Sequence, residues 1–195
     1  KEFEKGADAQ LPKDMSFRSA NEDDRRIGNL ALRATLAMDA LRLETIWVPF
    51  YRMSRLPDFS LGGPLVIGAP QAPGAELSNG TGAARLHLET AVLEASLSYL
   101  IGYSTMPGVT LQGVDVSADS GAPVASLAMT AYQHQVVGAD LSTTLGDWVG
   151  LRAEVAWRQA LDSEDDEDSW KPRPDVLAVL GLDREFGDLW VILQY

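Results

Sequence analysis

The feature of this sequence that most constrains its fold is a strict alternation of apolar and polar residues. Between Asn29 and Met38, the even positions carry Leu, Leu, Ala, Leu and Met, and the odd positions carry Asn, Ala, Arg, Thr and Ala. A period of two is typical of a β-strand whose two faces meet different surroundings. Residues 29–46 are also rich in helix formers, but Arg42 and Glu44 break the i, i+3, i+4 apolar spacing of a helix. The periodicity therefore predicts strands.

The alternation recurs along the chain in eight segments, which pair across short turns into four hairpins. A two-residue turn after Met38 keeps its side chain and that of Leu41 on the same side of the sheet. The predicted strands span residues 29–38, 41–47, 85–89, 93–103, 133–142, 149–158, 176–185 and 189–195. The predicted turns lie at residues 39–40, 91–92, 146–148 and 187–188.

The connections between these segments alternate in length. Four tight turns are separated by three long connections, at about residues 52–83, 104–125 and 159–175. Short turns at one end and long loops at the other are typical of bacterial outer-membrane barrels. A soluble antiparallel sandwich or lipocalin-like barrel alternates too, with its polar face outward, and this alternative stays open. We favour an all-β fold, an antiparallel transmembrane β-barrel with about eight strands in residues 1–195.

The aromatic residues fall at two levels of the predicted strands. With strands tilted by about 40°, each residue climbs about 2.5 Å along the membrane normal. Trp47, Tyr103 and Trp157 then lie about 18–27 Å from the turns, whereas Trp148 and Trp190 lie beside the turns. Two aromatic levels around an apolar band of about 25 Å favour interfacial girdles, although core aromatics would give the same residues.

Three polar residues fall on the apolar register. Gln133 and Gln135 lie far from their turn, about 28 Å away for Gln135, where the lipid should end. Arg184 lies three residues from a turn, where its side chain is expected to reach the headgroups. The two glutamines therefore lie where the lipid is expected to end, whereas Arg184 is a misfit on the apolar register.

The strand directions predict that the chain is part of a larger barrel. If the tight turns are periplasmic, the first strand runs inward from the outside and the last runs outward. A complete bacterial barrel begins and ends in the periplasm, so we expect further strands. In this interpretation residues 1–26 form an outer loop, and residues 27–195 form the four hairpins. A closed eight-stranded barrel with a filled interior is geometrically allowed but less compatible with these directions.

Composition excludes several classes of function. The formal net charge of −12 argues against a nucleic-acid partner, because phosphate binding needs a basic surface. The chain has no cysteine, so it offers no disulfide framework, zinc-thiolate site or cysteine nucleophile. No apolar run approaches the roughly 18 residues of a membrane helix, which leaves strands as the route across a bilayer.

The polar register provides the candidate site. Charged residues of both signs would line a lumen and set solute selectivity, or they would form a salt-bridge lattice that satisfies the interior. Because both signs are present, strong selectivity for anions or cations does not follow. The predicted pore-lining residues are Arg33, Arg42, Glu44, Arg85, His87, Glu89, Glu94, Asp140, Arg152, Glu154, Arg158 and Asp183.

We expect neither a metal, a cofactor nor an enzymatic activity. The acidic run at residues 162–168 lacks the spaced Asp, Asn and Gly of a calcium loop, so a solvated outer loop is favoured over calcium binding. A hydrolase would need a serine, a histidine and an orienting group within hydrogen-bond reach. Ser96 and Ser98 neighbour His87, and His134 lies near the outer rim, but no motif marks a nucleophile.

Several phrases of the chain resemble a large proteobacterial group of porin-like outer-membrane proteins of unknown function. The likeness covers much of residues 25–60 and 90–195 and contains no catalytic motif. The phrases are RRIGNLALRA, LRLETIWVPFYRMSRLP, LEASLSYLIGYSTMPG, VVGADLSTTLGDWVGLRAEVAW and LAVLGLDREFGDLWVILQY. The resemblance implies a pore-like barrel longer at both ends, without an assigned substrate.

The expected function is passive transport of a solute across the bacterial outer membrane. The alternative is a structural or docking barrel in a trans-envelope assembly. The expected partners are membrane lipid or lipopolysaccharide and other barrel or envelope protein chains.

Overall fold

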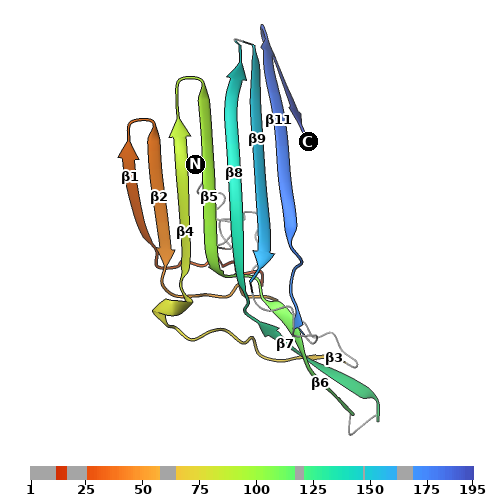
Figure 1. The fold of residues 1–195 in the computed structure, drawn as a ribbon. Coiled ribbons are helices and arrows are strands. Elements are labelled where there is room, and N and C mark those ends of the chain that lie inside the picture. Colours follow the sequence, from red (N-terminus) through yellow and green to blue (C-terminus); the bar gives the residue numbers. More distant parts are fainter. Residues whose placement is uncertain (1–11, 17–25, 58–64, 117–120, 147, 162–168) are drawn as a thin grey trace.

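The fold consists of two β-sheets joined end to end (Figure 1). The computed structural model describes residues 12–16, 26–57, 65–116, 121–146, 148–161 and 169–195. One sheet has eight strands, in the order β1-β2-β4-β5-β8-β9-β11-β12, and the other has four, in the order β10-β6-β7-β3. Among the described residues, no helix has the length and apolar character needed to cross a membrane.

The eight-stranded sheet confirms the predicted strands and their pairing into four hairpins. All neighbouring strands are antiparallel. The strands are β1 (Leu32–Met38), β2 (Leu41–Val48), β4 (Thr81–Glu89), β5 (Leu93–Tyr103), β8 (Gln133–Leu145), β9 (Val149–Ala160), β11 (Asp175–Phe186) and β12 (Leu189–Gln194). The bounds differ by a few residues, chiefly because β1 begins at Leu32 and β4 already at Thr81.

The four tight turns lie at one end of this sheet and the long connections at the other, as predicted (Figure 1). The backbone at Asp39, Gly146 and Gly187 has φ angles of 46°, 62° and 61°. Tight hairpin turns need such positive angles to match the twist of the strands. Gly and Asp at these positions therefore fix the strand register.

The four-stranded sheet is built from the three long connections, which the sequence analysis treated as loops. It contains β3 (Leu65–Ile67), β6 (Gly108–Val116), β7 (Pro123–Thr130) and β10 (Ser169–Trp170), and a short 3₁₀ helix, η2 (Leu77–Asn79), precedes β4. β3 pairs with β7 in parallel, and β6 carries an irregularity between Leu111 and Gly113. The three long connections are therefore joined to one another by strand pairing.

The best-buried part of the described chain lies where the two sheets meet. The Tyr51 hydroxyl donates a 2.8 Å hydrogen bond to the carbonyl of Ser104. Burial is the main cause that raises the pKa of Tyr51 well above its usual range, and the neighbouring Tyr132 and Tyr103 add to it. His134, almost fully buried, places its Nδ1 3.1 Å from the Gly102 carbonyl oxygen. This junction joins the four-stranded sheet to the ends of the strands of the eight-stranded sheet.

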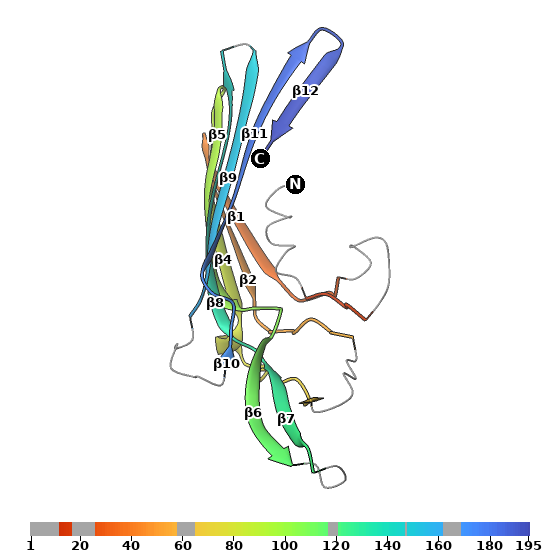
Figure 2. The ribbon, with the colours of Figure 1, turned by 90° about the vertical axis from the view of Figure 1, so that its right-hand side faces the viewer.

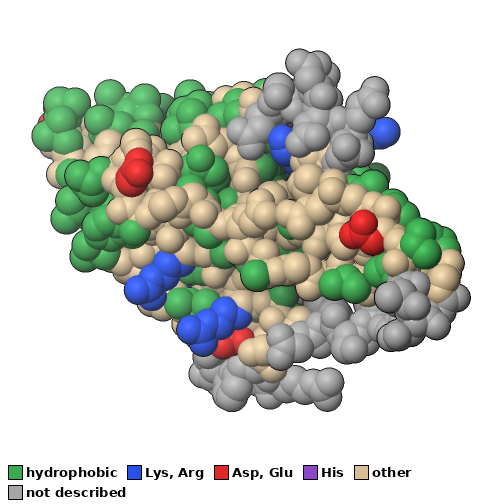
Figure 3. Space-filling view, turned by 90° about the horizontal axis from the view of Figure 1, so that it is seen from below, with side chains coloured by type: hydrophobic (Ala, Val, Ile, Leu, Met, Phe, Trp, Pro, Cys, Tyr) green, Lys and Arg blue, Asp and Glu red, His purple; other side chains and the backbone are tan. Residues whose placement is uncertain are grey.

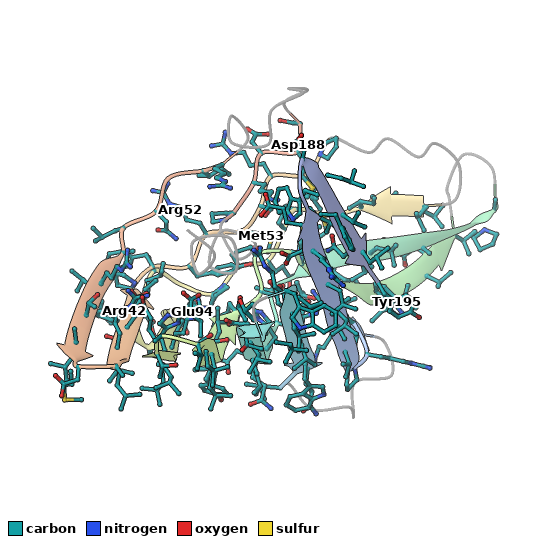
Figure 4. The ribbon with its side chains drawn as sticks, turned by 90° about the horizontal axis from the view of Figure 1, so that it is seen from above. Arg42, Arg52, Met53, Glu94, Asp188 and Tyr195 are labelled. Atoms are coloured by element: carbon teal, nitrogen blue, oxygen red, sulfur yellow. The ribbon has the colours of Figure 1, made fainter. Side chains whose placement is uncertain are left out.

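The eight-stranded sheet is curved and open. Viewed along its strands it forms an arc (Figure 4), and in the side view the β11–β12 hairpin leans over the concave side (Figure 2). In the described part of the chain, β1 and β12 are the two edges and do not pair with each other. β12 pairs only with Gly181–Phe186 and, through Tyr195, with Leu180. The rest of that edge of β11 has no strand partner among the described residues.

Candidate functional site

The convex face of the eight-stranded sheet is apolar from strand to strand. Directly paired residues project on the same side of a sheet, so the register assigns each side chain to a face. One row crosses seven strands through Leu36, Leu43, Leu86, Leu97, Ala139, Val155 and Ala178. The row nearer the turns contains Met38, Leu41, Leu88, Ala95, Leu141, Ala153 and Leu180.

These apolar side chains are exposed. Leu36, Leu97 and Leu180 are 54%, 57% and 49% exposed, whereas Ala128 and Tyr132 are the only buried hydrophobic residues of the described chain. A space-filling view from the end that carries the four-stranded sheet shows hydrophobic side chains along the margin of the molecule (Figure 3). Monomeric soluble proteins rarely expose apolar patches larger than about 300–600 Å². A face running across eight strands therefore requires an apolar covering.

The apolar face ends in polar groups at the end of the strands near the long connections. The Tyr99 hydroxyl donates a 3.1 Å hydrogen bond to Oε1 of Gln135. The amide of Gln135 in turn donates to Gln159, its direct partner on β9, over 3.4 Å. Gln135 thus joins a ladder that bounds the apolar band, at the position where the sequence placed the end of the lipid.

The border at the turn end of the apolar face is formed by an arginine between aromatic rings. The guanidinium of Arg184 lies 4.4 Å from the ring centroids of Trp148 and of Phe186. Such cation–π contacts stabilise an arginine on an otherwise apolar surface. Arg184 therefore lies beside the tight turns on the apolar face, packed against Trp148, which was expected at that level, and against Phe186. Trp190, also expected there, pairs with Glu185 and so lies on the concave face.

The concave face carries the twelve predicted pore-lining residues. The register puts all of them on this side, and the view along the strands shows Arg42 and Glu94 on the inner side of the arc (Figure 4). They are Arg33, Arg42, Glu44, Arg85, His87, Glu89, Glu94, Asp140, Arg152, Glu154, Arg158 and Asp183. The structure thus gathers them on one surface, and whether that surface lines a pore remains a prediction.

Two arginines on the β1–β2 side of the concave face share one carboxylate. Arg33 Nη2 and Arg42 Nε lie 3.0 Å and 3.5 Å from Oε1 of Glu44. Glu44 is 6% exposed, although it lies on a sheet surface. A buried carboxylate is tolerated when cations accompany it, so these three residues form a small ionic cluster.

The middle of the concave face contains a network of Arg85, Ser96 and Asp140. Arg85 Nη2 lies 2.8 Å from Oδ2 of Asp140, and its Nε donates a 2.7 Å hydrogen bond to Ser96 Oγ. Ser96 donates in turn to the same Asp140 oxygen. The Ser96 hydroxyl is thus hydrogen-bonded to both members of the ion pair. His87 is the direct register partner of Ser96, and its Nε2 lies 3.9 Å from Oε2 of Glu89.

Two further arginine pairs lie on β9 and β11. Arg158 donates two hydrogen bonds to Asp175 in a bidentate fork, 3.0 Å from Nε to Oδ1 and 2.7 Å from Nη2 to Oδ2. Arg152 Nε lies 3.9 Å from Oδ1 of Asp183. Asp175 was missed in the sequence, because it precedes the first apolar residue of its strand.

The described residues contain no group of three or more His, Cys, Asp or Glu side chains that could hold a metal ion. His134 belongs to the junction between the sheets, where the Gly102 carbonyl fixes its ring. The acidic run at residues 162–168 lies outside the described residues, as do residues 1–11. The expectation that this run is a solvated loop and does not bind calcium therefore stays a prediction.

No protein-family profile matches the chain, and comparisons with curated proteins and with solved structures give no match. The function therefore has to be inferred from the two faces of the sheet.

Proposed function

We propose that the eight-stranded sheet is a wall section of a transmembrane β-barrel in a bacterial outer membrane, and that the barrel allows passive passage of a solute. The observation that carries this proposal is the exposed apolar convex face opposite a charged concave face. Outer-membrane barrels combine a lipid-facing apolar band with a polar interior. Both surfaces come from the same alternation in the sequence.

The free energy of the exposed face favours lipid over water as its surroundings. Burying a large aliphatic or aromatic side chain contributes about 1.5–3 kcal/mol. Well over ten large side chains of the convex face are more than a third exposed, so covering them is worth on the order of 10 kcal/mol. This is as large as the stability of a typical domain, about 5–15 kcal/mol. Lipid would provide that covering along the whole face.

The dimensions of the sheet fit a bilayer. β5 has 11 residues and β9 has 12, which at a rise of about 2.5 Å per residue along the normal gives roughly 27–30 Å. The Gln135 ladder and Arg184 lie near opposite ends of this span. Polar and aromatic groups at these two levels are expected where hydrocarbon gives way to headgroups.

A soluble sandwich accounts less well for the same sheet. Its apolar face would pack against a second sheet about 10 Å away. Here the second sheet lies beyond the strand ends and leaves the convex face uncovered (Figures 1 and 2). The arrangement favours a membrane barrel with a structured outer end.

The open edges imply further strands in the proposed barrel. In lipid, each unpaired backbone group costs several kcal/mol, so the edges at β1 and β12 must be hydrogen-bonded. We propose that strands from outside the described residues pair with both edges and close the barrel. This agrees with the expectation of a larger barrel and with partners that include lipid or lipopolysaccharide.

A structural or docking barrel is the second candidate function. The specific observation that favours it is the four-stranded sheet, whose β6–β7 hairpin extends away from the main sheet (Figure 1). Val114 and Val116 on this hairpin are 61% and 71% exposed. An ordered outer sheet with exposed apolar residues suits contact with another envelope protein.

Conductance distinguishes the two candidates. The complete barrel, purified in detergent and added to a planar lipid bilayer, should give stepwise increases in current. Steps that persist after removal of any co-purifying protein support a passage for solutes. A barrel that inserts but does not conduct, and that holds a stoichiometric partner, contradicts transport and favours docking.

A further inference from the structure

We infer that the passage formed by the concave face prefers cations to anions. This inference rests on the proposed function, since it concerns the selectivity of the same passage. Its starting point is the pairing state of each charged group on the concave face, which the sequence alone did not reveal. The described strands place five arginines and eight carboxylates on this face.

Every arginine of the concave face lies in an ion pair with a carboxylate, and two of them share one. Arg33 and Arg42 lie against Glu44, and the other three pair with an aspartate each. A passing anion would have to compete with a carboxylate that is already in place. With eight carboxylates and five arginines, the face also carries an excess of three negative charges.

Four carboxylates have no arginine partner among the described residues, and one of them, Glu89, has only His87, 3.9 Å away. Glu94, Glu154 and Glu185 are exposed and make no ion pair with any residue that the structure describes. Their charges face the concave side without a neutralising arginine. The charge that remains available to a solute is therefore negative.

The arrangement of Glu89 and Glu94 points the same way. These two residues are direct register partners on β4 and β5. Like charges directly opposite each other across two strands are destabilising. The pair therefore concentrates negative potential at the turn end of the face.

The charges are also ordered along the strands. The rows nearest the tight turns contain four carboxylates and one arginine, namely Glu185, Asp183, Glu89, Glu94 and Arg152, whereas one row near the long connections contains Arg33, Arg158 and Asp175. A lumen with low-dielectric walls focuses such a potential and raises the local concentration of counter-ions. We therefore place the cation preference at the turn end of the barrel.

The reversal potential of the complete barrel in a planar bilayer under a KCl gradient tests the inference. At about 0.1 M salt, where the screening length is about 10 Å, we expect potassium to permeate more readily than chloride. The double variant E94Q/E154Q should lower the permeability ratio by about threefold or more, as the loss of a charge at several ångströms implies. Removing Glu94 also relieves the repulsion with Glu89, so this variant should fold at least as well as the parent.

A matched control is E76Q, which removes one carboxylate from the connection before η2 and lies outside the sheet. Its permeability ratio should equal that of the parent. A conducting barrel that is unselective or anion-selective, or one that the double variant leaves unchanged, overturns the inference and leaves the passage itself in place. A barrel that never conducts overturns both proposals.

Discussion

Replacing Leu97 with arginine should destabilise the protein in a bilayer by about 2–4 kcal/mol, the cost of an arginine at the hydrocarbon midplane of a barrel. Leu97 is 57% exposed and is the fifth residue of β5. At about 2.5 Å per residue it lies about 10 Å from the start of an apolar span of roughly 27 Å. The expected loss lowers the folding equilibrium constant by a factor of about 30 to 900.

The matched control is Thr35→Arg. Thr35 is exposed on the concave face and lies one residue from Leu36, which belongs to the same row as Leu97. Its direct partner is Glu44, so a new arginine there would face a carboxylate and water. The assay is guanidinium-induced unfolding of the complete barrel in lipid vesicles, followed by tryptophan fluorescence. Equal losses for the two variants would refute the assignment of the faces.

Two further predictions concern the junction and the strand ends. Gly102→Ala should cost about 1–3 kcal/mol, because a Cβ there would lie 2.7 Å from Cα of Thr81 and φ is 156°, whereas Gly82→Ala, with open space, should be nearly neutral in the same unfolding assay. Burial raises the pKa of Tyr51 in the folded protein above its ordinary value of about 10. The contribution of Tyr51 to stability is therefore fully present below about pH 10 and is lost as the pH rises through the pKa of the folded state. Tyr51→Phe should therefore lose the hydrogen bond to Ser104, at a cost of about 1 kcal/mol, and flatten the alkaline loss of stability. An unchanged pH profile would exclude Tyr51 as its source.

The eight-stranded sheet could be predicted from the sequence because its signal is local. Period-two alternation defines all four hairpins, each within one continuous stretch of the chain, and the turn residues Asp39, Gly146 and Gly187 mark three of them. The same alternation separates the concave from the convex residues, so the twelve candidate residues fall on one face as expected. Such local features set the strand register without contacts between residues that are distant in the sequence.

The four-stranded sheet could not be predicted in the same way, because β3 and β10 pair with strands that are distant in the sequence. β3 has only three residues and β10 two, too few for a periodic signal, and both bind to a hairpin from another connection. The β6 strand alternates weakly, since the irregularity between Leu111 and Gly113 shifts its register. A salt-bridge lattice on the concave face was one of the two expected arrangements, but the individual ion pairs could not be predicted, because they depend on which side chains the fold brings within reach.

The measurement that tests the central claim most directly is the accessibility of single spin labels along β5. The chain has no cysteine, so a cysteine at Ala95, Leu97, Tyr99, Glu94 or Ser98 gives one label site each. In vesicles, labels at Ala95, Leu97 and Tyr99 should collide with dissolved oxygen and be protected from a water-soluble nickel complex, because they would face lipid. Labels at Glu94 and Ser98 should show the opposite preference. Nickel accessibility at all five positions, or a label pattern without a period of two, would contradict a transmembrane barrel.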